Sequence, residues 1–368
     1  MKPREKILLT LSHREIPELA RDFGGTVVTS ITLQAYRALR THLRLSADEP
    51  VVVMDNVLGL AVPSESILRR LKSDFRRVGP IAGSLQLVDG VWTDSWGIRR
   101  RKANPHDYYD QVKPYPIEEC DITDIEKLVF PNPNETAEFN HYKDAAKDLY
   151  DNSPYAIIAD AVAPGLLGNC LRMRGYETFF VDILTDEAFV KALLERLLEH
   201  YKAVYTHYLE RVGKFVQVVC YGDDLGMQDR LMMAPEVFRR LFKPYYKALF
   251  THIKNKTDAK LFLHTCGSVY SIIEDLIEIG VDILNPVQPQ AKDMDPIKLK
   301  AEFSNRIVFW GGVDLQGYLR SGNAEDVKYN ISKLATSLNQ SGGYVLAASH
   351  NIQSDIPPEN IESMYCSY

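Results

Sequence analysis

The chain has 368 residues, a formal net charge of −6, and a composition of 45% hydrophobic and 25% charged residues. These values exclude a disordered chain and allow either one large α/β domain or two smaller ones. The densest basic run, Arg99-Arg100-Arg101-Lys102, is interpreted as a solvated loop. An acidic chain without a longer basic tract is not expected to bind nucleic acid.

The cysteines and the N-terminus indicate a cytoplasmic protein. Five widely spaced cysteines do not form a disulfide framework, which favours a reducing compartment. The charged start, Met1 to Lys6, is not followed by a long apolar run, so no signal peptide is expected. No stretch approaches the roughly 20 apolar residues of a membrane span, so no membrane association is expected.

In chain order, residues 1–150 are irregular and rich in turns, whereas residues 151–368 alternate short apolar runs with longer amphipathic stretches. Near-continuous apolar runs are typical of parallel strands that are buried on both faces. Six strands are expected at residues 155–161, 215–221, 260–264, 281–286, 307–312 and 343–348. An earlier pair at 19–23 and 75–78 brings the number to eight. We therefore predict one (β/α)₈ TIM-barrel domain over residues 1–368, in which 1–150 form an N-terminal cap and the early barrel.

Helices are expected between these strands. Residues 186–212 carry an apolar stripe at helical spacing. Pro244 should kink or split the helix expected at 236–253, and Asn323 should cap the helix that begins at Ala324. The rival fold is an open doubly wound sheet, but no G-x-G-x-x-G motif follows any of the expected strands.

Polar residues follow the expected strands where each one ends. Barrel enzymes carry their chemistry at this C-terminal rim. Turn-forming residues could account for one or two polar groups at strand ends. They account less well for a polar group at the end of every one of the six later strands. The candidate site residues are Asp160, Asp223, Asp224, His264, Cys266, Asn285, Gln288, Asp314 and His350.

His264 and Cys266 are the most specific pair. Residues i and i+2 of an extended segment point to the same side, so imidazole and thiolate could bind one zinc ion. His350 is the candidate third ligand, and Asp223 or Asp224 could supply an oxygen instead. The alternative is structural, with Cys266 packed and His264 hydrogen-bonded in the barrel mouth.

Asp223 and Asp224 also have two interpretations. One of them could bind metal or exchange a proton with substrate, or it could cap the following segment. On a strand, adjacent side chains face opposite ways, so at most one would enter the site, whereas in a loop both could. Elsewhere, Trp96 is expected in the core rather than in a pocket wall.

The chain resembles the uroporphyrinogen decarboxylase superfamily over nearly its full length, and more closely its methyltransferase branch that works with corrinoid proteins. The resemblance rests on Asp22-Phe23-Gly24-Gly25-Thr26, Asp94-Ser95-Trp96-Gly97-Ile98, Gly222-Asp223-Asp224-Leu225-Gly226, His264-Thr265-Cys266-Gly267, Asn285-Pro286-Val287-Gln288-Pro289, Gly311-Gly312-Val313-Asp314 and Ser349-His350-Asn351-Ile352-Gln353. It implies a TIM barrel and makes a homodimer one possible assembly.

The resemblance to the decarboxylases themselves is incomplete. They imply an Arg-x-x-x-Arg motif close behind the first strand, where this chain has residues 24–30 without arginine. Their tyrosine before the Gly175 turn is replaced by Cys170 or Leu171, although their late histidine matches His350. For the zinc methyltransferases, the resemblance implies that His264 and Cys266 are zinc ligands. Their third ligand is a later cysteine, where this chain has His350.

We therefore expect a zinc-dependent methyltransferase that moves a methyl group between a small molecule, such as a methoxylated donor, and a corrinoid (cobalamin) held by a partner protein. In this hypothesis Asp223 or Asp224 orients or protonates the substrate, and Asp160, Asn285, Gln288 and Asp314 contact it. The alternatives are decarboxylation of a tetrapyrrole or smaller acid, and non-catalytic binding of a corrinoid or porphyrin.

Overall fold

Eight parallel strands curl into a barrel in the computed structural model, which describes residues 1–46, 49–104, 108–303 and 305–366. Their order around the sheet is β1-β14-β13-β12-β11-β10-β9-β5, so each of the last six strands in the chain lies beside its sequence neighbour. The strands are β1 (Ala20–Arg21), β5 (Phe75–Val78), β9 (Ala156–Ala159), β10 (Val218–Gly222), β11 (Lys260–His264), β12 (Ile283–Val287), β13 (Val308–Val313) and β14 (Tyr344–Ala348).

The two end strands of this order, β1 and β5, come together through the backbone of Arg21 and Asp74. The Asp74 amide donates to the Arg21 carbonyl at 2.9 Å, and the Arg21 amide donates to the Asp74 carboxylate at 2.8 Å. Lys6 pairs with the same carboxylate at 2.7 Å. These contacts bring the ends of the sheet together, and they confirm the predicted TIM barrel.

The barrel interior is filled by alternate residues of the strands, as the two-residue period of a strand requires. Phe75, Phe262 and Trp310 pack there with ring centroids 4.6 and 5.2 Å apart, Trp310 being common to both pairs. Cys220 belongs to the same buried cluster. A larger apolar cluster lies between the outer faces of the strands and the helices.

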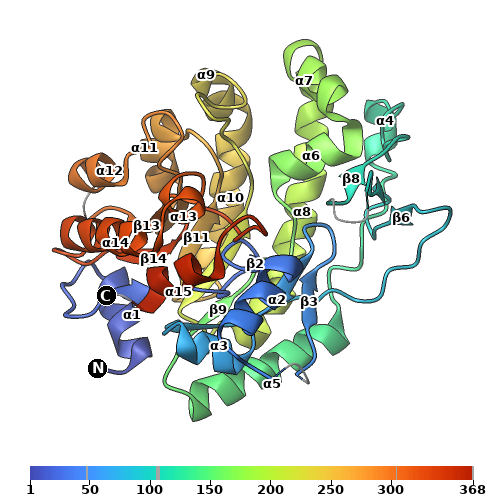
Figure 1. Ribbon diagram of the computed structural model, residues 1–368. Coiled ribbons are helices and arrows are strands. Elements are labelled where there is room, and N and C mark those ends of the chain that lie inside the picture. The colour runs from blue at the N-terminus through green and yellow to red at the C-terminus, as the bar shows by residue number, and fades with distance from the viewer. Residues whose placement is uncertain (47–48, 105–107, 304, 367–368) are drawn as a thin grey trace.

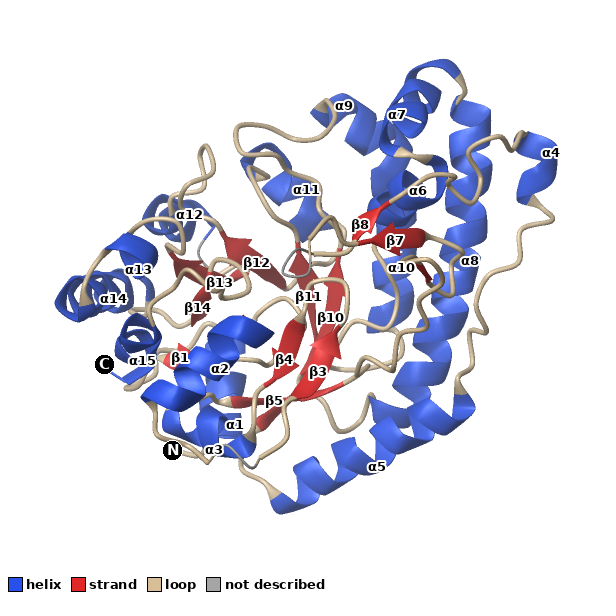
Figure 2. Cartoon of the chain, turned by 45° about the vertical axis from the view of Figure 1, so that its right-hand side comes forward, coloured by secondary structure: helices blue, strands red, loops and turns tan. Residues whose placement is uncertain are grey.

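Helices surround the strands on the outside (Figures 1 and 2). α1 (Pro3–Leu11) covers the N-terminal end of the barrel, where Ile7 and Leu11 pack on the interior cluster. The other helices are α2 (Leu33–His42), α3 (Glu65–Arg70), α4 (Ile122–Ile125), α5 (Thr136–Asn152), α6 (Leu166–Arg174), α7 (Tyr176–Thr185), α8 (Glu187–Val212), α9 (Pro235–Val237), α10 (Lys243–Lys254), α11 (Ile273–Glu278), α12 (Pro296–Phe303), α13 (Tyr318–Ser321), α14 (Ala324–Leu338) and α15 (Pro358–Cys366). No helix within the described ranges is both long and apolar enough to cross a membrane.

Two local predictions about the helices are confirmed. The helix around Pro244 is split: a π-helical turn at Phe238–Phe242 precedes α10, and Pro244 falls in the first turn of α10, where a missing amide is tolerated. Asn323 caps α14 by accepting hydrogen bonds from the amides of Glu325 and Asp326.

Two small antiparallel sheets in the first third of the chain were not predicted. One contains β2 (Ile31–Thr32), β4 (Leu60–Val62) and β3 (Val52–Asp55), and the other contains β6 (Trp92–Thr93), β7 (Arg99–Arg101) and β8 (Asp110–Gln111). The interpretation of residues 99–102 as a solvated loop was wrong. Residues 99–101 are the central strand of their sheet, and the Arg100 side chain is only 11% exposed. The expectation that Trp96 lies in the core rather than in a pocket wall was wrong: Trp96 is only half-buried, packs against the core and forms part of a cavity wall beside His200.

Candidate functional site

Polar side chains occupy the last inward-facing positions of several barrel strands. Ile158, Phe262 and Ile283 belong to the interior cluster, so the residues two positions later continue on the same side of their strands. Those residues are Asp160, His264 and Asn285, and all three are buried. The two-residue alternation of side chains along the strands therefore explains why these three groups face the interior at the C-terminal mouth of the barrel.

His264, at the end of β11, is held by Asn285 on the neighbouring strand β12. Its Nδ1 lies 2.7 Å from Asn285 Oδ1, and Asn285 Nδ2 donates to the Trp310 carbonyl at 3.2 Å. Because the carbonyl can only accept, the amide nitrogen must face Trp310 and the amide oxygen must face His264. His264 therefore carries its proton on Nδ1, which leaves the lone pair of Nε2 available to a ligand.

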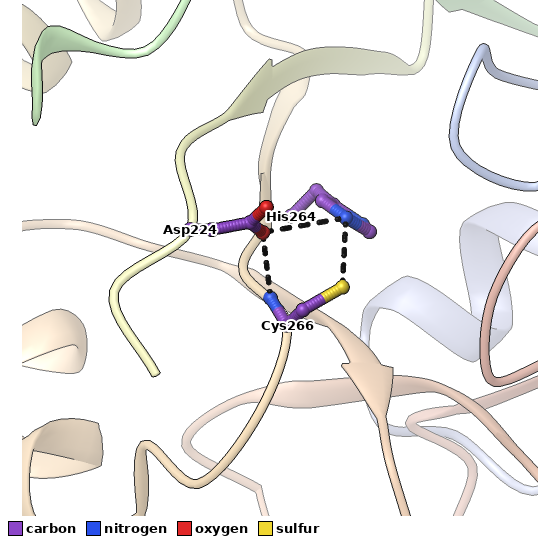
Figure 3. A group of neighbouring side chains, drawn as sticks. All are labelled: Asp224, His264 and Cys266. Atoms are coloured by element: carbon purple, nitrogen blue, oxygen red, sulfur yellow. Dashed lines mark hydrogen bonds and ion pairs between the residues drawn. The ribbon is translucent and has the colours of Figure 1, made fainter. Parts of the chain in front are cut away.

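Cys266 and Asp224 lie on the Nε2 side of that ring (Figure 3). The distance from Nε2 to Cys266 Sγ is 3.4 Å, and the distance to Asp224 Oδ1 is 3.8 Å. Asp224 follows β10 and also accepts a hydrogen bond from the Cys266 amide at 2.9 Å, which fixes the two residues relative to each other. Burial, together with the charge of Asp224, raises the pKa of the Cys266 thiol.

These three side chains suit a small, tetrahedral metal ion. One ligand atom from each of Asp224, His264 and Cys266 lies within 4.8 Å of the others. Zinc bonds of about 2.0–2.3 Å in a tetrahedron place neighbouring ligand atoms roughly 3.5 Å apart. One nitrogen, one sulfur and one oxygen from protein, with a fourth position left open, is a donor set that catalytic zinc accepts. The arrangement thus fits zinc with little adjustment.

His350, the other candidate ligand, lies beside this group but outside it. Its Nδ1 is 3.5 Å from the Asn351 carbonyl, and its side chain lines a cavity of about 290 Å³. Burial and the nearby His264 lower the pKa of His350. The cavity also contacts polar side chains from the loops after β12, β13 and β14, including Gln288, Gln316, Ser349 and Gln353.

Asp223 points away from Asp224, toward the start of α6. Its carboxylate accepts hydrogen bonds from the amides of Leu167 at 2.7 Å and Gly168 at 2.8 Å, and from the Tyr246 hydroxyl at 2.6 Å. Burial raises the pKa of Asp223 to about 6, although these hydrogen bonds favour its charged form. Of the two adjacent acids, Asp224 faces the candidate metal ligands and Asp223 ties α6 to the end of β10.

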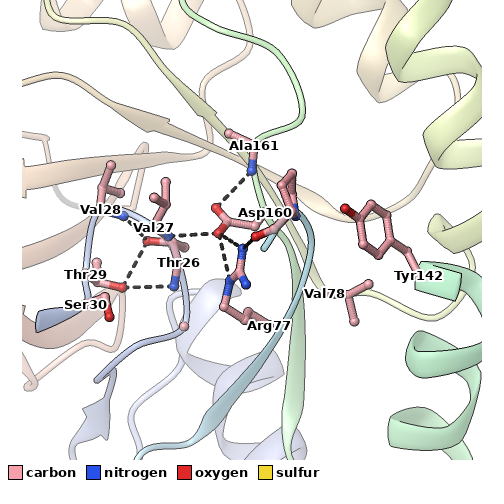
Figure 4. Close-up of polar contacts among 12 residues, drawn as sticks. Thr26, Val27, Val28, Thr29, Ser30, Arg77, Val78, Tyr142, Asp160 and Ala161 are labelled. Atoms are coloured by element: carbon pink, nitrogen blue, oxygen red, sulfur yellow. Dashed lines mark hydrogen bonds and ion pairs between the residues drawn. The ribbon is translucent and has the colours of Figure 1, made fainter. Parts of the chain in front are cut away.

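Asp160 is engaged by protein groups on every side (Figure 4). Its Oδ2 accepts from Arg77 Nε and Nη2 at 3.0 and 2.8 Å and from the Val27 amide at 2.8 Å, while Oδ1 accepts from the Ala161 amide at 2.9 Å. The buried ion pair of Asp160 with Arg77, together with the Val27 contact, holds the loop after β1 against β5 and β9. The structure places Asp160 in the mouth with its oxygens already bound.

Asp22 is a buried acid that sequence reasoning did not single out as a site residue. It directly follows β1, and its carboxylate accepts from the Gly25 amide at 2.8 Å and from Trp310 Nε1 at 3.0 Å. Burial raises the pKa of Asp22 to about 7. Its position two residues after the inward-facing Ala20 is the signal that could have identified it.

Gln288 and Asp314 make different contacts. Gln288 Oε1 accepts from the Gly267 amide at 2.9 Å, next to Cys266, and Gln288 also lines the cavity beside His350. Asp314 is buried, and its carboxylate accepts from the amides of Gln316 and Gly317 at 3.0 and 2.9 Å. Gln288 is therefore close to the candidate ligands, whereas Asp314 shapes the loop after β13.

Comparison with known proteins agrees with this architecture. Among solved structures, a methyltransferase from Methanosarcina mazei matches with a TM-score of 0.67 at 14% identity, covering 100% of this chain and 98% of that chain. Xylanase B from Clostridium stercorarium F9 matches with a TM-score of 0.36 at 12% identity, covering 64% of this chain and 83% of that chain. A search of curated proteins found no match. The uroporphyrinogen decarboxylase (URO-D) family model matches residues 106–367, more than half of the chain, and the chain therefore belongs to this family.

Proposed function

We propose that this protein is a zinc-dependent methyltransferase that moves a methyl group between a small molecule and a corrinoid held by a partner protein. The observation that carries the proposal is the convergence of Asp224, His264 and Cys266 on one point at the barrel mouth. When bound there, zinc supplies a Lewis acid for a methyl-bearing oxygen or holds an acceptor thiol as thiolate.

The residues around this point support the proposal by preparing the ligands. Asn285 fixes the tautomer of His264, and Asp224 holds the Cys266 amide. Gln288 holds the next amide, that of Gly267, and so fixes the turn after Cys266. Such contacts orient ligands before a metal arrives and typically alter metal affinity by one to two orders of magnitude.

Geometry favours Asp224 over His350 as the third ligand. Asp224 Oδ1 is 3.8 Å from His264 Nε2, whereas His350 lies outside the group of converging ligand atoms. In this proposal His350 and Gln288 face the small molecule in the adjoining cavity. The sequence-based alternative, with His350 on the metal, stays open to the experiment below.

The test combines metal analysis with a methyl-transfer assay. We expect about one zinc per chain, lost in His264→Ala and Cys266→Ala and retained in the control Cys120→Ala, which changes another partly buried cysteine. Asp224→Ala should weaken zinc binding more than His350→Ala does; the opposite order would establish His350 as the ligand. Methyl transfer from methoxylated compounds to reduced cobalamin should be followed by absorbance. Absence of stoichiometric zinc, together with full activity of Cys266→Ala, would contradict the proposal.

Decarboxylation remains the second candidate because His350 is retained at the barrel mouth. The loop after β1 offers no guanidinium for substrate carboxylates, and Arg40, on α2, binds the carbonyls of Ser46 and Glu49 instead. Release of CO₂ from a porphyrinogen by the purified protein would favour this function over methyl transfer.

A further inference from the structure

Within the described residues, the guanidinium group of Arg172, on α6, makes no hydrogen bond or ion pair at contact distance, although its charge lowers the pKa of the nearby Asp223. The residue is half-buried. Its Nη2 and Nη1 lie 3.3 and 3.5 Å from the point where a side chain at Gly168 would place its Cβ, and Asp223 Oδ1 lies 3.1 Å from the same point. Arg172 therefore sits close to the start of α6, beside Asp223.

Asp223 does not neutralise this guanidinium by direct contact. Its two oxygens already accept hydrogen bonds from the amides of Leu167 and Gly168 and from the Tyr246 hydroxyl. An arginine presents five N–H donors in a planar fork, and a carboxylate or phosphate can accept two of them at once. Arg172 thus offers a fork that is open to an oxyanion.

Arg100 is a second arginine in this part of the fold, linked to Arg172 through Gln111. On the small sheet, Arg100 lies opposite Gln111, whose side-chain amide donates to the Arg172 carbonyl. The Arg100 side chain is 11% exposed, and its contacts with Asp94 Oδ2, from Nε and Nη2, are both 3.3 Å, at the long end for a charged pair. Burial lowers the pKa of Arg100, and so does the charge of Arg172, which indicates that the two cations are near each other.

Asp223 connects the surroundings of Arg172 to the candidate metal ligands through the backbone. Asp223 precedes Asp224 in the chain, and its amide donates to the His264 carbonyl at 2.9 Å. α6 follows the loop after β9, so Arg172 belongs to the same C-terminal rim of the barrel. A small molecule at the rim could place one end near Asp224 and another end near the arginines.

We propose that Arg100 and Arg172 form an oxyanion subsite that binds a carboxylate of the small-molecule substrate. Assigning the carboxylate to a methyl donor or acceptor rests on the function proposed above, whereas anion binding itself does not. Two guanidinium groups, one with an open fork and one with long contacts, are the chemistry that recognises such a group. The subsite would select an acidic substrate over a neutral compound of the same shape.

The test is calorimetric titration of the full-length protein with benzoate, its neutral isostere benzamide, and inorganic phosphate. We expect saturable binding of one benzoate per chain, weakened about tenfold or more in Arg172→Met and Arg100→Met, as expected for loss of a charge-assisted pair. Arg172→Lys should retain part of the binding. Arg306→Met should leave it unchanged, because Arg306 lies elsewhere and pairs with Glu274. Benzamide should bind equally weakly to the wild type and to Arg172→Met.

Three outcomes would overturn the subsite: no saturable binding of benzoate, equal benzoate affinity in wild type and Arg172→Met, or saturation by phosphate alone. Circular dichroism and melting temperature establish that each variant is folded. Methionine preserves most of the apolar stem of arginine, and Arg172→Lys provides a second variant that keeps the charge. The titration needs neither zinc nor corrinoid, so a protein that binds benzoate through these arginines but contains no zinc and keeps full activity in Cys266→Ala would contradict zinc-dependent methyl transfer but not the subsite.

Discussion

Replacing Asn285 by alanine is expected to weaken zinc binding without touching any of the three candidate ligands. The wild-type side chain is 1% exposed and joins His264 Nδ1, at 2.7 Å, to the Trp310 carbonyl, at 3.2 Å. Without it, His264 can place its proton on either nitrogen, and the ring loses the contact that orients it. Loss of such a second contact typically costs 10- to 100-fold in metal affinity, or about 1.4–2.7 kcal/mol.

The measurement is competition for zinc between the protein and a chromophoric chelator at constant pH. Asn360→Ala is the matched control, because Asn360 is equally buried and donates two hydrogen bonds, to the carbonyls of Leu319 and Gly322, away from the site. Both variants should lose stability, whereas only Asn285→Ala should lose zinc affinity. A zinc dissociation constant for Asn285→Ala within twofold of the wild-type value would refute the assignment of the His264 tautomer.

Three further predictions concern ionisable side chains that are wholly or partly buried. Asp160→Ala should lower the free energy of unfolding, measured in urea, by about 3–5 kcal/mol, because it leaves Arg77 buried without its partner; a loss below about 1 kcal/mol would contradict this. Asp22 has a pKa raised from 3.8 to about 7, so its ionisation should cost stability as pH rises from about 4 to 7, and Asp22→Asn should remove that slope. Burial lowers the pKa of His200 from 6.5 to about 4, so stability should fall as pH drops through this interval, and melting curves of His200→Gln should lack that part of the acid sensitivity.

The barrel could be predicted from sequence because its strands are buried on both faces. Such strands appear as near-continuous apolar runs, and the expected ranges at 260–264 and 343–348 contain β11 and β14. The two small sheets could not be found in this way. Their strands are only two to four residues long, too short for apolar continuity or alternation to distinguish them from loops. Arg100 was misinterpreted for this reason: its burial comes from tertiary packing, which no local sequence pattern records.

For the site, local geometry could predict only how residues within one strand, or directly after it, lie relative to each other. The i and i+2 spacing placed His264 and Cys266 side by side, whereas Asp223 and Asp224 follow β10 in a loop, where strand alternation does not decide their directions. Which of the two acids faces Cys266 depends on the start of α6, which takes up Asp223. That contact joins residues 55 and 56 positions apart, so no local pattern could reveal it.

The polar side chains at the barrel mouth differ in whether their polar atoms are already hydrogen-bonded to other protein groups. Asp160 and Asp22 have both carboxylate oxygens bound by protein donors, so they are suited to hold the loop after β1 rather than to receive a ligand. His264 has one nitrogen committed to Asn285 and the other directed at Cys266 and Asp224. A buried imidazole arranged in this way is prepared for an electrophile at Nε2, because Asn285 acts on Nδ1 alone. The polar side chains at the barrel mouth therefore fall into two classes. Some, such as Asp160 and Asp22, stabilise the loops through hydrogen bonds, whereas the candidate metal ligands direct an atom at a position that a metal could occupy.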